Sequence, residues 1–278
     1  MTLNTQSVGL RYSGKPRLIA ADESMFFALS VGDTNPAYLD RRWPGGLMAP
    51  PVYAAVYAHD PIREALKDPR VGVHYPSIVH YAQSFTWHRP VRPGDEITTD
   101  GLIAEVARYE NGGVLTVDTA SKNQNNETVT TGAWTFFDKS AKVENVGRSP
   151  RITEPTGTTV WHDTLAVPTY QSYVYAEASK DRNAIHTDFD AAKKRGLSGI
   201  IVHGFCTMAC CHRVVVNRLC NRDPEQLSSF SLQFSKPVFP GDRLALEGFH
   251  LKENMFGIRV KNQQGRSVLR HVKGSLKS

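Results

Sequence analysis

A carboxylate, an amide and an imidazole lie within six residues of one another, at Asp181, Asn183 and His186. Histidine has a reference pKa of roughly 6.5, so it exchanges protons near neutral pH, and a carboxylate can hold its tautomer or share the base role. A tight turn could bring Asp181 and His186 together around one water molecule. Asn183 is suited to fixing such a loop by hydrogen bonds to the backbone. The residues predict acid–base chemistry on water, although the same spacing is typical of turn and capping residues.

The segments that follow would position a reacting group. Asp188 is a predicted N-cap for a short helix over residues 189–195, and Gly196 is its expected stop. A longer apolar helix, enclosed on all sides, is predicted to begin at His203-Gly204. Backbone amides at a helix start are free donors, and a glycine lets a ligand approach them closely. We expect the Gly204 amide to form an oxyanion site for a thioester carbonyl, with tight helix packing as the other explanation for this glycine.

The chain also repeats itself. FALSVGDTNPAYLD, residues 27–40, and YAEASKDRNAIHTD, residues 175–188, share an aromatic residue, Ala, Ser, Asp-x-Asn and a closing Asp. HRPVRPGD and SKPVFPGD, which end at Asp95 and Asp242, match as well. Because the two motifs repeat at nearly the same offset, we infer a tandem duplication.

Each half reads as one apolar helical stretch followed by four strands. The strands show the alternation of β-branched and aromatic residues that is typical of half-exposed sheet, and Pro-Gly-Asp turns separate some of them. They are expected at residues 77–88, 95–109, 112–123 and 127–137, and again at 228–235, 243–252, 254–262 and 267–277. This order predicts an α+β double hotdog, in which two antiparallel sheets each wrap a central helix and pair through their edge strands.

We assign residues 1–140 to an N-terminal hotdog, 141–157 to a polar linker rich in turn formers, and 158–278 to a C-terminal hotdog. In the first half Asp33 is present, but Tyr38 stands where the second half has its histidine. A phenol with a reference pKa of roughly 10 is a poor proton shuttle at neutral pH. We therefore expect a degenerate site in the first half.

Composition indicates an ordinary globular protein of 278 residues, 40% hydrophobic and 22% charged. No apolar run approaches the roughly 20 residues of a membrane helix. The formal net charge is +6, but Lys and Arg are scattered, without the basic and aromatic platform of a nucleic-acid site. The N-terminal segment lacks the apolar core of a secretory signal, and the chain ends in SLKS rather than a peroxisomal Ser-Lys-Leu address. We expect a cytoplasmic protein.

All four cysteines fall in one short segment, at Cys206, Cys210, Cys211 and Cys220. Without paired Cys-x-x-Cys knuckles a zinc site is not expected, and neighbours on one helix do not make a disulfide framework. The pattern favours buried, reduced core thiols.

The combined motifs resemble a known family. Residues 175–196, followed by IIVHGFCTMA and FSKPVFPGD, resemble the hydratase-2 motif of the MaoC-like (R)-specific enoyl-CoA hydratases, and the duplication fits the two-hotdog members. The resemblance implies hydration of a trans-2-enoyl-CoA to the (3R)-hydroxyacyl-CoA, or the reverse dehydration, in fatty acid metabolism, without cofactor or metal. Where the family usually has Gly and Pro, this chain has Lys180 and Ala184, which bears on loop rigidity and substrate preference.

The resemblance also implies a role for each matched group. Asp181 and His186 would hold and deprotonate the attacking water and return a proton to the α-carbon. Asn183 would support the loop, and the Gly204 amide would polarise the thioester carbonyl. The degenerate first half would complete the fold and accommodate the acyl chain.

Four further residues are weaker candidates for substrate binding. Lys193, Lys194 and Arg195 could meet a CoA phosphate, since these side chains are natural phosphate partners. A solvated helix end, favoured by the helix dipole, is the alternative for this cationic turn. His212 could border the pocket, or it could be a core or surface histidine.

Other functions remain open at this stage. A dehydratase of acyl-carrier-protein substrates or a hotdog thioesterase would use the same fold, and an acyl-CoA-binding scaffold subunit would use it without chemistry. Release of free CoA thiol distinguishes thioester cleavage from hydration. As partners we expect an acyl-CoA thioester and a second copy in a homodimer, with no nucleic acid and no membrane insertion.

Overall fold

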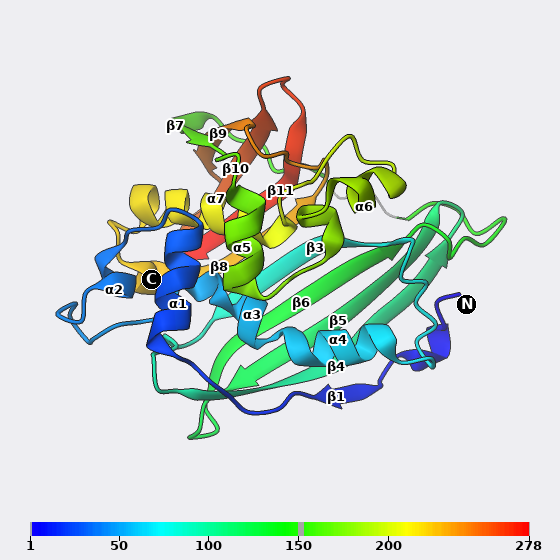
Figure 1. Ribbon diagram of the computed structural model, residues 1–278, viewed down its shortest axis with the longest axis horizontal. Helices are drawn as coiled ribbons and strands as arrows, with labels where there is room; N and C mark the ends of the chain where they lie inside the picture. Colours follow the sequence, from blue (N-terminus) through cyan, green and yellow to red (C-terminus); the bar gives the residue numbers. More distant parts are fainter. Residues whose placement is uncertain (1, 150–152, 278) are drawn as a thin grey trace.

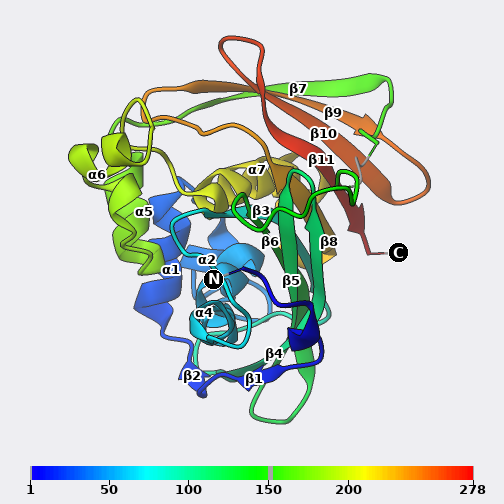
Figure 2. The ribbon, with the colours of Figure 1, turned by 90° about the vertical axis from the view of Figure 1, so that its right-hand side faces the viewer.

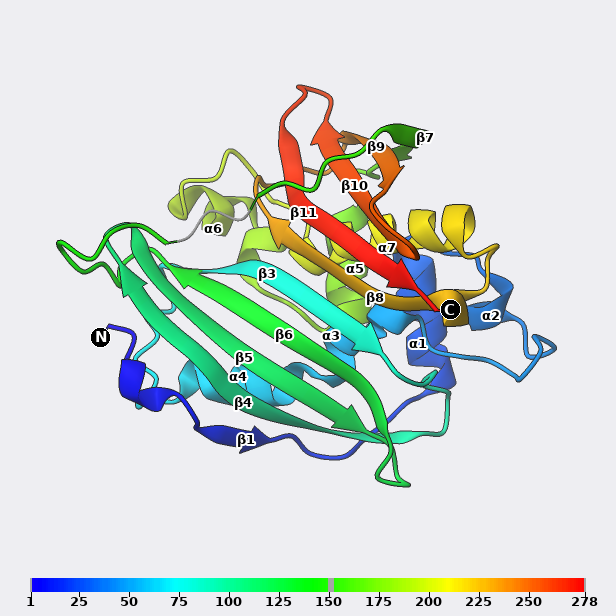
Figure 3. The ribbon, with the colours of Figure 1, turned by 180° about the vertical axis from the view of Figure 1, so that it is seen from behind.

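The computed structural model describes residues 2–149 and 153–277, so residues 150–152 of the expected linker lie outside it. Within the described residues one antiparallel sheet of 11 strands runs through both halves of the chain (Figures 1 and 3). Its strand order is β1-β4-β5-β6-β3-β8-β11-β10-β9-β7, with the short β2 paired to β4. The two sheets of the double hotdog are therefore continuous with each other.

The eight predicted strands are all present. The first half contributes β1 (Arg11–Ser13), β2 (Arg17–Leu18), β3 (Ile78–Trp87), β4 (Glu96–Tyr109), β5 (Gly112–Lys122) and β6 (Thr128–Asp138). The second half contributes β7 (Thr159–Ala166), β8 (Leu227–Phe234), β9 (Arg243–His250), β10 (Met255–Asn262) and β11 (Ser267–Leu276). The short strands β1 and β2 and the edge strand β7 were not predicted.

The halves join through β3 and β8, as expected for paired edge strands. The two strands run antiparallel and place Phe85 opposite Phe230. Both rings are fully buried, with exposed fractions of 1% and 0%. Pairing these strands removes two sheet edges that would otherwise be open to another chain.

The helices gather on one face of the curved sheet (Figure 2). In the first half they are η1 (Thr5–Ser7), α1 (Ala21–Ser30), α2 (Pro36–Leu39), η2 (Pro51–Tyr53), α3 (Ala54–Tyr57) and α4 (His59–Lys67). In the second half they are α5 (Gln171–Ser179), η3 (Ala184–His186), α6 (Phe189–Lys194), α7 (Gly204–Leu219) and η4 (Pro224–Gln226). No helix in the described parts of the chain is long and apolar enough to span a membrane.

The two central helical segments differ in continuity. The second half has one 16-residue helix, α7, whereas the first half divides the same path into η2, α3 and α4. The division falls at Ala58, whose backbone (φ −92°, ψ 8°) is outside the helical region. The apolar stretch of the first half, residues 50–58, was expected to form one helix; it forms the two short segments η2 and α3, and α4 begins at the next residue.

The repeated Pro-Gly-Asp motifs have one structural role. Asp95 accepts a hydrogen bond from the amide of Arg92 at 2.7 Å, and Asp242 accepts one from the amide of Phe239 at 2.8 Å. Each carboxylate closes its own turn, as Asp commonly does. The repeat therefore supports the fold in both halves alike, and the difference between the halves lies elsewhere.

Candidate active site

The loop after α5 is organised by its own side chains. Asp181 Oδ1 accepts a hydrogen bond from the amide of Asn183 at 3.2 Å, and Asn183 Oδ1 accepts one from the amide of Ile185 at 3.4 Å, where η3 begins. The capping interpretation of these two residues is therefore correct as geometry. It does not exclude chemistry, because the Asp181 side chain is exposed and its second oxygen is not used in this turn.

Lys180 enters this loop in an unusual backbone conformation. It caps α5 with φ 61°, in the left-handed region, and Gly32 occupies the equivalent place in the first half with φ 66°. A residue with a side chain pays roughly 1 kcal/mol or more for this conformation. The position is thus one where glycine would be favoured on backbone grounds alone.

His186 is held with one nitrogen fixed and one available. Its ring is 7% exposed, and Nδ1–H donates to the carbonyl oxygen of Ile201 at 2.8 Å. A neutral ring that donates through Nδ1 has a lone pair on Nε2. Burial lowers the pKa of His186, while the Ile201 bond and the charge of Asp181 oppose that shift. The lowered pKa favours the neutral form of the His186 ring near pH 7.

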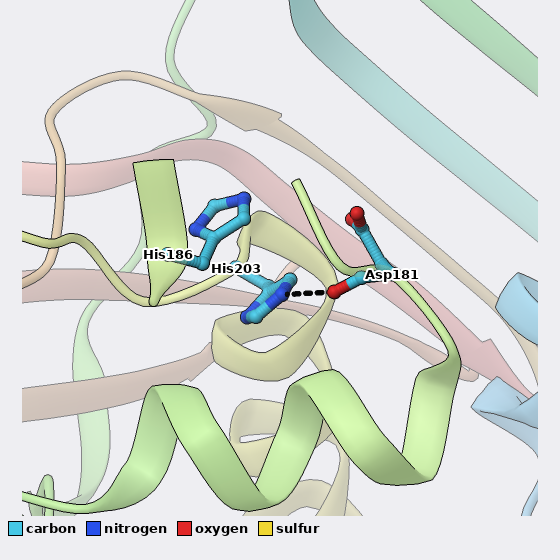
Figure 4. Close-up of side chains that lie close together, drawn as sticks. All are labelled: Asp181, His186 and His203. Atoms are coloured by element: carbon cyan, nitrogen blue, oxygen red, sulfur yellow. Dashed lines mark hydrogen bonds between the residues drawn. The ribbon is translucent and has the colours of Figure 1, made fainter. Parts of the chain in front are cut away.

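His203 lies directly against His186, which the sequence did not predict. The two rings stack with centroids 3.7 Å apart and planes at 22°. His203 Nε2–H donates to the main-chain oxygen of Asp181 at 2.9 Å, the dashed line in Figure 4. Its Nδ1 is buried and has no hydrogen-bond partner among the described residues. Burial, with the neighbouring imidazole, lowers the pKa of His203.

Asp181 and His186 come close enough to share a water. One donor or acceptor atom from each of Asp181, His186 and His203 lies within 4.8 Å of the others. No direct bond joins the carboxylate to the His186 ring. Two groups at this spacing can both bond one water, because each hydrogen bond spans roughly 2.8 Å. The predicted arrangement around one water molecule is therefore compatible with the geometry.

The same three residues are the described ones that could hold a cation. Two histidines and a carboxylate form a ligand set for several transition metals. Zinc bonds of about 2.1 Å would require ring nitrogens to converge on one point, whereas these rings stack nearly parallel. Metal binding would thus require one ring to turn out of the stack.

Gly204 is the first residue of α7. The preceding His203 makes no side-chain cap bond, so the first amides of the helix are not capped by that residue. A Cβ on Gly204 would meet the Phe234 ring at 3.0 Å. Packing against this ring thus favours glycine here, and its backbone amide lies at a helix start suited to an oxyanion.

The first half has neither an imidazole at the position of His186 nor a backbone N–H at the position of Gly204. The amide of Ala49 donates to Val91 just as the amide of Val202 donates to Val238, both at 2.8 Å. This match places Pro51 at the position of Gly204, and proline has no N–H to offer a carbonyl. Tyr38 replaces His186, and its hydroxyl is buried with no hydrogen-bond partner among the described residues.

The remaining carboxylate of the first half is buried. Asp33 is 4% exposed, and burial raises its pKa to about 6. Burial also raises the pKa of Tyr38 well above the usual value for a phenol. Both side chains are thus shut off from solvent, unlike the exposed Asp181.

Two histidines of the first half lie within reach of the Asp181 charge. His59 begins α4 and is exposed, and His80 on β3 is half-buried. Burial lowers the pKa of both, to about 4 for His80, and the Asp181 charge opposes the shift in each. The Asp181 loop therefore faces these two histidines of the first half closely enough for its charge to act on them.

Four aromatic rings surround His80 and are called the aromatic wall below: those of Trp134, Phe136, Phe205 and Phe234. The His80 ring centroid lies 5.8 Å from Trp134, 5.0 Å from Phe136, and 4.9 Å from both Phe205 and Phe234. A register shift in β3 between His80 and Ala82 interrupts the pairing with β6 at this point. Such bulges re-aim a side chain, and here His80 reaches Gln83 at 3.2 Å and the aromatic rings.

The four weaker candidates for substrate binding lie in different environments. Lys193, Lys194 and Arg195 are exposed at the end of α6; Lys193 Nζ lies 4.7 Å over the Phe189 ring, and Arg195 donates to the carbonyl of Pro76 at 2.8 Å. His212 is 1% exposed and packs on Trp87 at 5.5 Å between ring centroids. Burial lowers its pKa to about 3. His212 is thus a core residue in this structure, and its contact with a ligand stays a prediction.

Comparison with known proteins places both halves in related groups. A family profile described as "MaoC like domain" matches residues 143–270, and one described as "FAS1-like, dehydratase domain region" matches residues 6–132. A protein of Dictyostelium discoideum named "Probable enoyl-CoA hydratase 2" is 32% identical over 100 residues, which is 36% of this chain and 34% of that protein.

Solved structures share the whole fold. A MaoC-like dehydratase from Phytophthora capsici superposes with a TM-score of 0.84 at 17% identity, covering 99% of this chain and 98% of that one. A Mycobacterium tuberculosis protein described as a double hotdog superposes with a TM-score of 0.65 at 14% identity, covering 97% and 96%. The predicted double hotdog fold is confirmed.

Proposed function

Because this chain belongs to the MaoC-like dehydratases, we propose that it hydrates a trans-2-enoyl-CoA to the (3R)-hydroxyacyl-CoA, or catalyses the reverse, at Asp181 and His186. Membership supports hydratase or dehydratase activity in general. The observation that carries the finer proposal is the spacing of Asp181 and His186, at most 4.8 Å between their polar atoms, with Nε2 of His186 left as an acceptor.

The residues can divide the reaction among themselves. Asp181 and His186 bond one water, and Nε2 of His186 takes its proton as the oxygen bonds to C3 of the enoyl group. Electron density moves onto the thioester oxygen, which the Gly204 amide at the start of α7 stabilises. The proton then returns to C2, and the thioester stays intact.

We place the acyl group along the aromatic wall, to which both halves contribute rings. His80, Phe205 and Phe234 are half-buried, so part of each ring is open to a ligand. Phe205 follows Gly204 directly, which joins the wall to the oxyanion site. Apolar and aromatic surface of this kind favours acyl groups over water by roughly 25 cal/mol per Å² that is buried.

The proposal also covers the residues that contact CoA, the oligomeric state and the cellular location of the protein. Lys193, Lys194 and Arg195 are proposed to meet the CoA phosphates, because they are exposed cations on the element that follows the catalytic loop. We also propose a homodimer, a cytoplasmic location and a role in fatty acid metabolism. The domain bounds 1–140 and 158–278, with linker 141–157, belong to the same proposal.

Loss of the conjugated-thioester absorbance tests the proposal. Purified protein is mixed with a panel of enoyl-CoAs of different chain length, and free thiol is measured in the same samples. Loss of absorbance without thiol release is expected. Thiol release would indicate a thioesterase, turnover only of carrier-protein thioesters would indicate a dehydratase of that system, and tight binding without turnover would indicate a scaffold subunit.

A further inference from the structure

Two buried polar atoms without hydrogen-bond partners belong to rings that pack against each other. Among the described residues, neither the hydroxyl of Tyr175 nor Nδ1 of His203 has a partner. Tyr175 is 1% exposed and His203 is 2% exposed. Their ring centroids lie 5.0 Å apart, with the planes at 53°. Polar atoms buried this deeply are nearly always hydrogen-bonded, so a shared partner is expected where two of them adjoin.

The buried histidine His212 shows the contrast. Its Nε2 also has no hydrogen-bond partner among the described residues, but the ring packs on Trp87 and Phe230. Phe230 has no polar side-chain atom, and the indole N–H of Trp87 already donates to the carbonyl oxygen of Pro51 at 2.9 Å. His212 therefore has no polar neighbour on these rings, whereas His203 has one in Tyr175.

The two atoms are complementary as donor and acceptor. His203 Nε2–H donates to the main-chain oxygen of Asp181 at 2.9 Å, so the neutral ring has a lone pair on Nδ1. Burial lowers the pKa of His203, which favours this neutral ring. Burial raises the pKa of Tyr175 well above the usual value for a phenol, so its hydroxyl keeps its proton and can donate it. A donor and an acceptor thus lie on rings in contact.

We propose that Tyr175 is a positioning residue for Asp181 and His186, and that its hydroxyl donates to one buried water molecule, which in turn donates to Nδ1 of His203. No direct bond joins the hydroxyl to Nδ1, and a water with two polar partners can be held in a protein interior. The positioning role rests on the hydration proposed at Asp181 and His186. The hydrogen bonds of the water do not depend on that activity.

The water bond would fix the orientation of the His203 ring. With both nitrogens bonded, this ring cannot turn about its bond to Cβ without breaking a hydrogen bond. Figure 4 shows it between the helix that leads into Asp181 and the loop that carries Asp181. The His186 ring stacks on it, with centroids 3.7 Å apart. Loss of the Tyr175 hydroxyl would therefore remove a fixed neighbour from His186 and loosen the hydrogen bond to the Asp181 loop.

The first half supplies a guide to the variant and a matched control. The repeat aligns Phe27 with Tyr175, and Phe27 is fully buried in the equivalent helix. Since phenylalanine packs there, Tyr175→Phe should remove one oxygen atom and leave the fold intact. Tyr38, which with Asp33 forms the remnant site of the first half, also has a buried hydroxyl without a partner among the described residues. Tyr38→Phe is therefore the control.

NMR of the full chain with ¹⁵N-labelled histidine measures the hydrogen bond without any substrate. The Nδ1 resonance of His203 is assigned by its absence in His203→Gln. It should move toward the position of an unbonded lone pair in Tyr175→Phe and stay in place in Tyr38→Phe. An unchanged resonance in Tyr175→Phe would overturn the proposal. If that variant does not fold, a high-resolution crystal structure of the unmodified protein decides: one water within about 3.2 Å of both atoms is expected, and a site without it would contradict the proposal.

Steady-state kinetics of enoyl-CoA hydration tests the positioning role. Tyr175→Phe should lower kcat by about threefold to tenfold with little change in KM, because it disturbs the orientation of a reacting group and not the binding of substrate. Tyr38→Phe should change neither. An unaltered kcat in Tyr175→Phe, or an equal loss in Tyr38→Phe, would overturn the role. If the unmodified protein hydrates no enoyl-CoA, the proposed function fails and the positioning role with it, while the NMR result still decides the hydrogen bond.

Discussion

The imidazole rings of His186 and His203 stack 3.7 Å apart. Two positive charges at this separation repel strongly, so at most one of the two rings is positively charged near neutral pH. The Nδ1–H of His186 is fixed by Ile201, and the Nε2–H of His203 is fixed by the main chain of Asp181. His203 therefore links the start of α7 to the loop that carries Asp181. Its ring also packs face to face against the His186 imidazole and so limits the movement of that ring.

A variant of His203 tests this positioning role. His203→Leu should lower kcat by roughly 10–100-fold, the usual cost of losing a partner that orients a working group. His203→Gln can still donate to the oxygen of Asp181 and should recover part of the loss. Steady-state kinetics and thermal melts of both variants are compared, and equal kinetic losses would contradict a role for this hydrogen bond.

The asymmetry of the halves gives a second prediction. Asp181→Asn or His186→Ala should reduce turnover by roughly 10²–10⁴-fold, because each removes a positioned acid–base group. Asp33→Asn, the matched change in the remnant site, should alter turnover little. Enoyl-CoA hydration rates measure all three, and a comparable loss from Asp33→Asn would mean that the first half is catalytic.

Lys180 provides a test of local strain. Lys180→Gly should stabilise the protein by about 1 kcal/mol, because glycine adopts the left-handed conformation without the penalty of a side chain. Lys180→Ala keeps the penalty and serves as the control. Urea denaturation gives the free energy of unfolding for each, and a gain from alanine equal to that from glycine would assign the effect to the lysine charge.

The pH dependence follows from the burial of His186. Burial lowers its pKa below the ordinary value near 6.5, and the base must be neutral to accept a proton. The value of kcat/KM should therefore be constant through pH 7 and should fall only as the pH drops below about 6.5. A profile measured from pH 4 to 8 checks this, and an acid limb centred above 6.5 would contradict a buried neutral base.

The free energy of unfolding should also fall as the pH drops below about 6.5. The pKa values of His186, His203 and His212 are all lowered in the folded state, so the unfolded chain binds more protons below about pH 6.5. The stability these groups contribute is fully present above that pH and is lost as the pH falls. Denaturation midpoints at pH 7 and pH 5 measure this loss of stability. His212→Phe removes one of the three titrating groups, so the difference between the two midpoints should be smaller in this variant.

The sequence predicted what depends on local pattern. Alternation located the eight long strands, and Asp188 caps α6 through the amides of Asp190 and Ala191 as expected. Two matched motifs revealed the duplication. Each of these features depends on residues that are close together in the sequence or on a repeat within it, so it could be predicted from this sequence alone.

The features that were missed depend on contacts between distant segments. The stack of His203 on His186 joins residues 17 positions apart, and neither spacing nor residue type distinguishes it from a core histidine. The partial exposure of Cys210 depends on α1 of the other half. The edge strand β7 has eight residues, of which only Leu165 is buried, so no buried apolar face marks it in the sequence. The break at Ala58 has no glycine to mark it.

The stereochemistry of hydration in deuterated water tests the proposed chemistry most directly. If Asp181 and His186 hold one water on one face of the alkene, oxygen and hydrogen must add from that face, while the Gly204 amide determines which face is presented. Chiral analysis of the hydroxyacyl product, with the deuterium at C2 located by NMR, reports both. Syn addition with a (3R) product is predicted, and a (3S) product or anti addition would contradict the assignment of Asp181 and His186 even if hydration were observed.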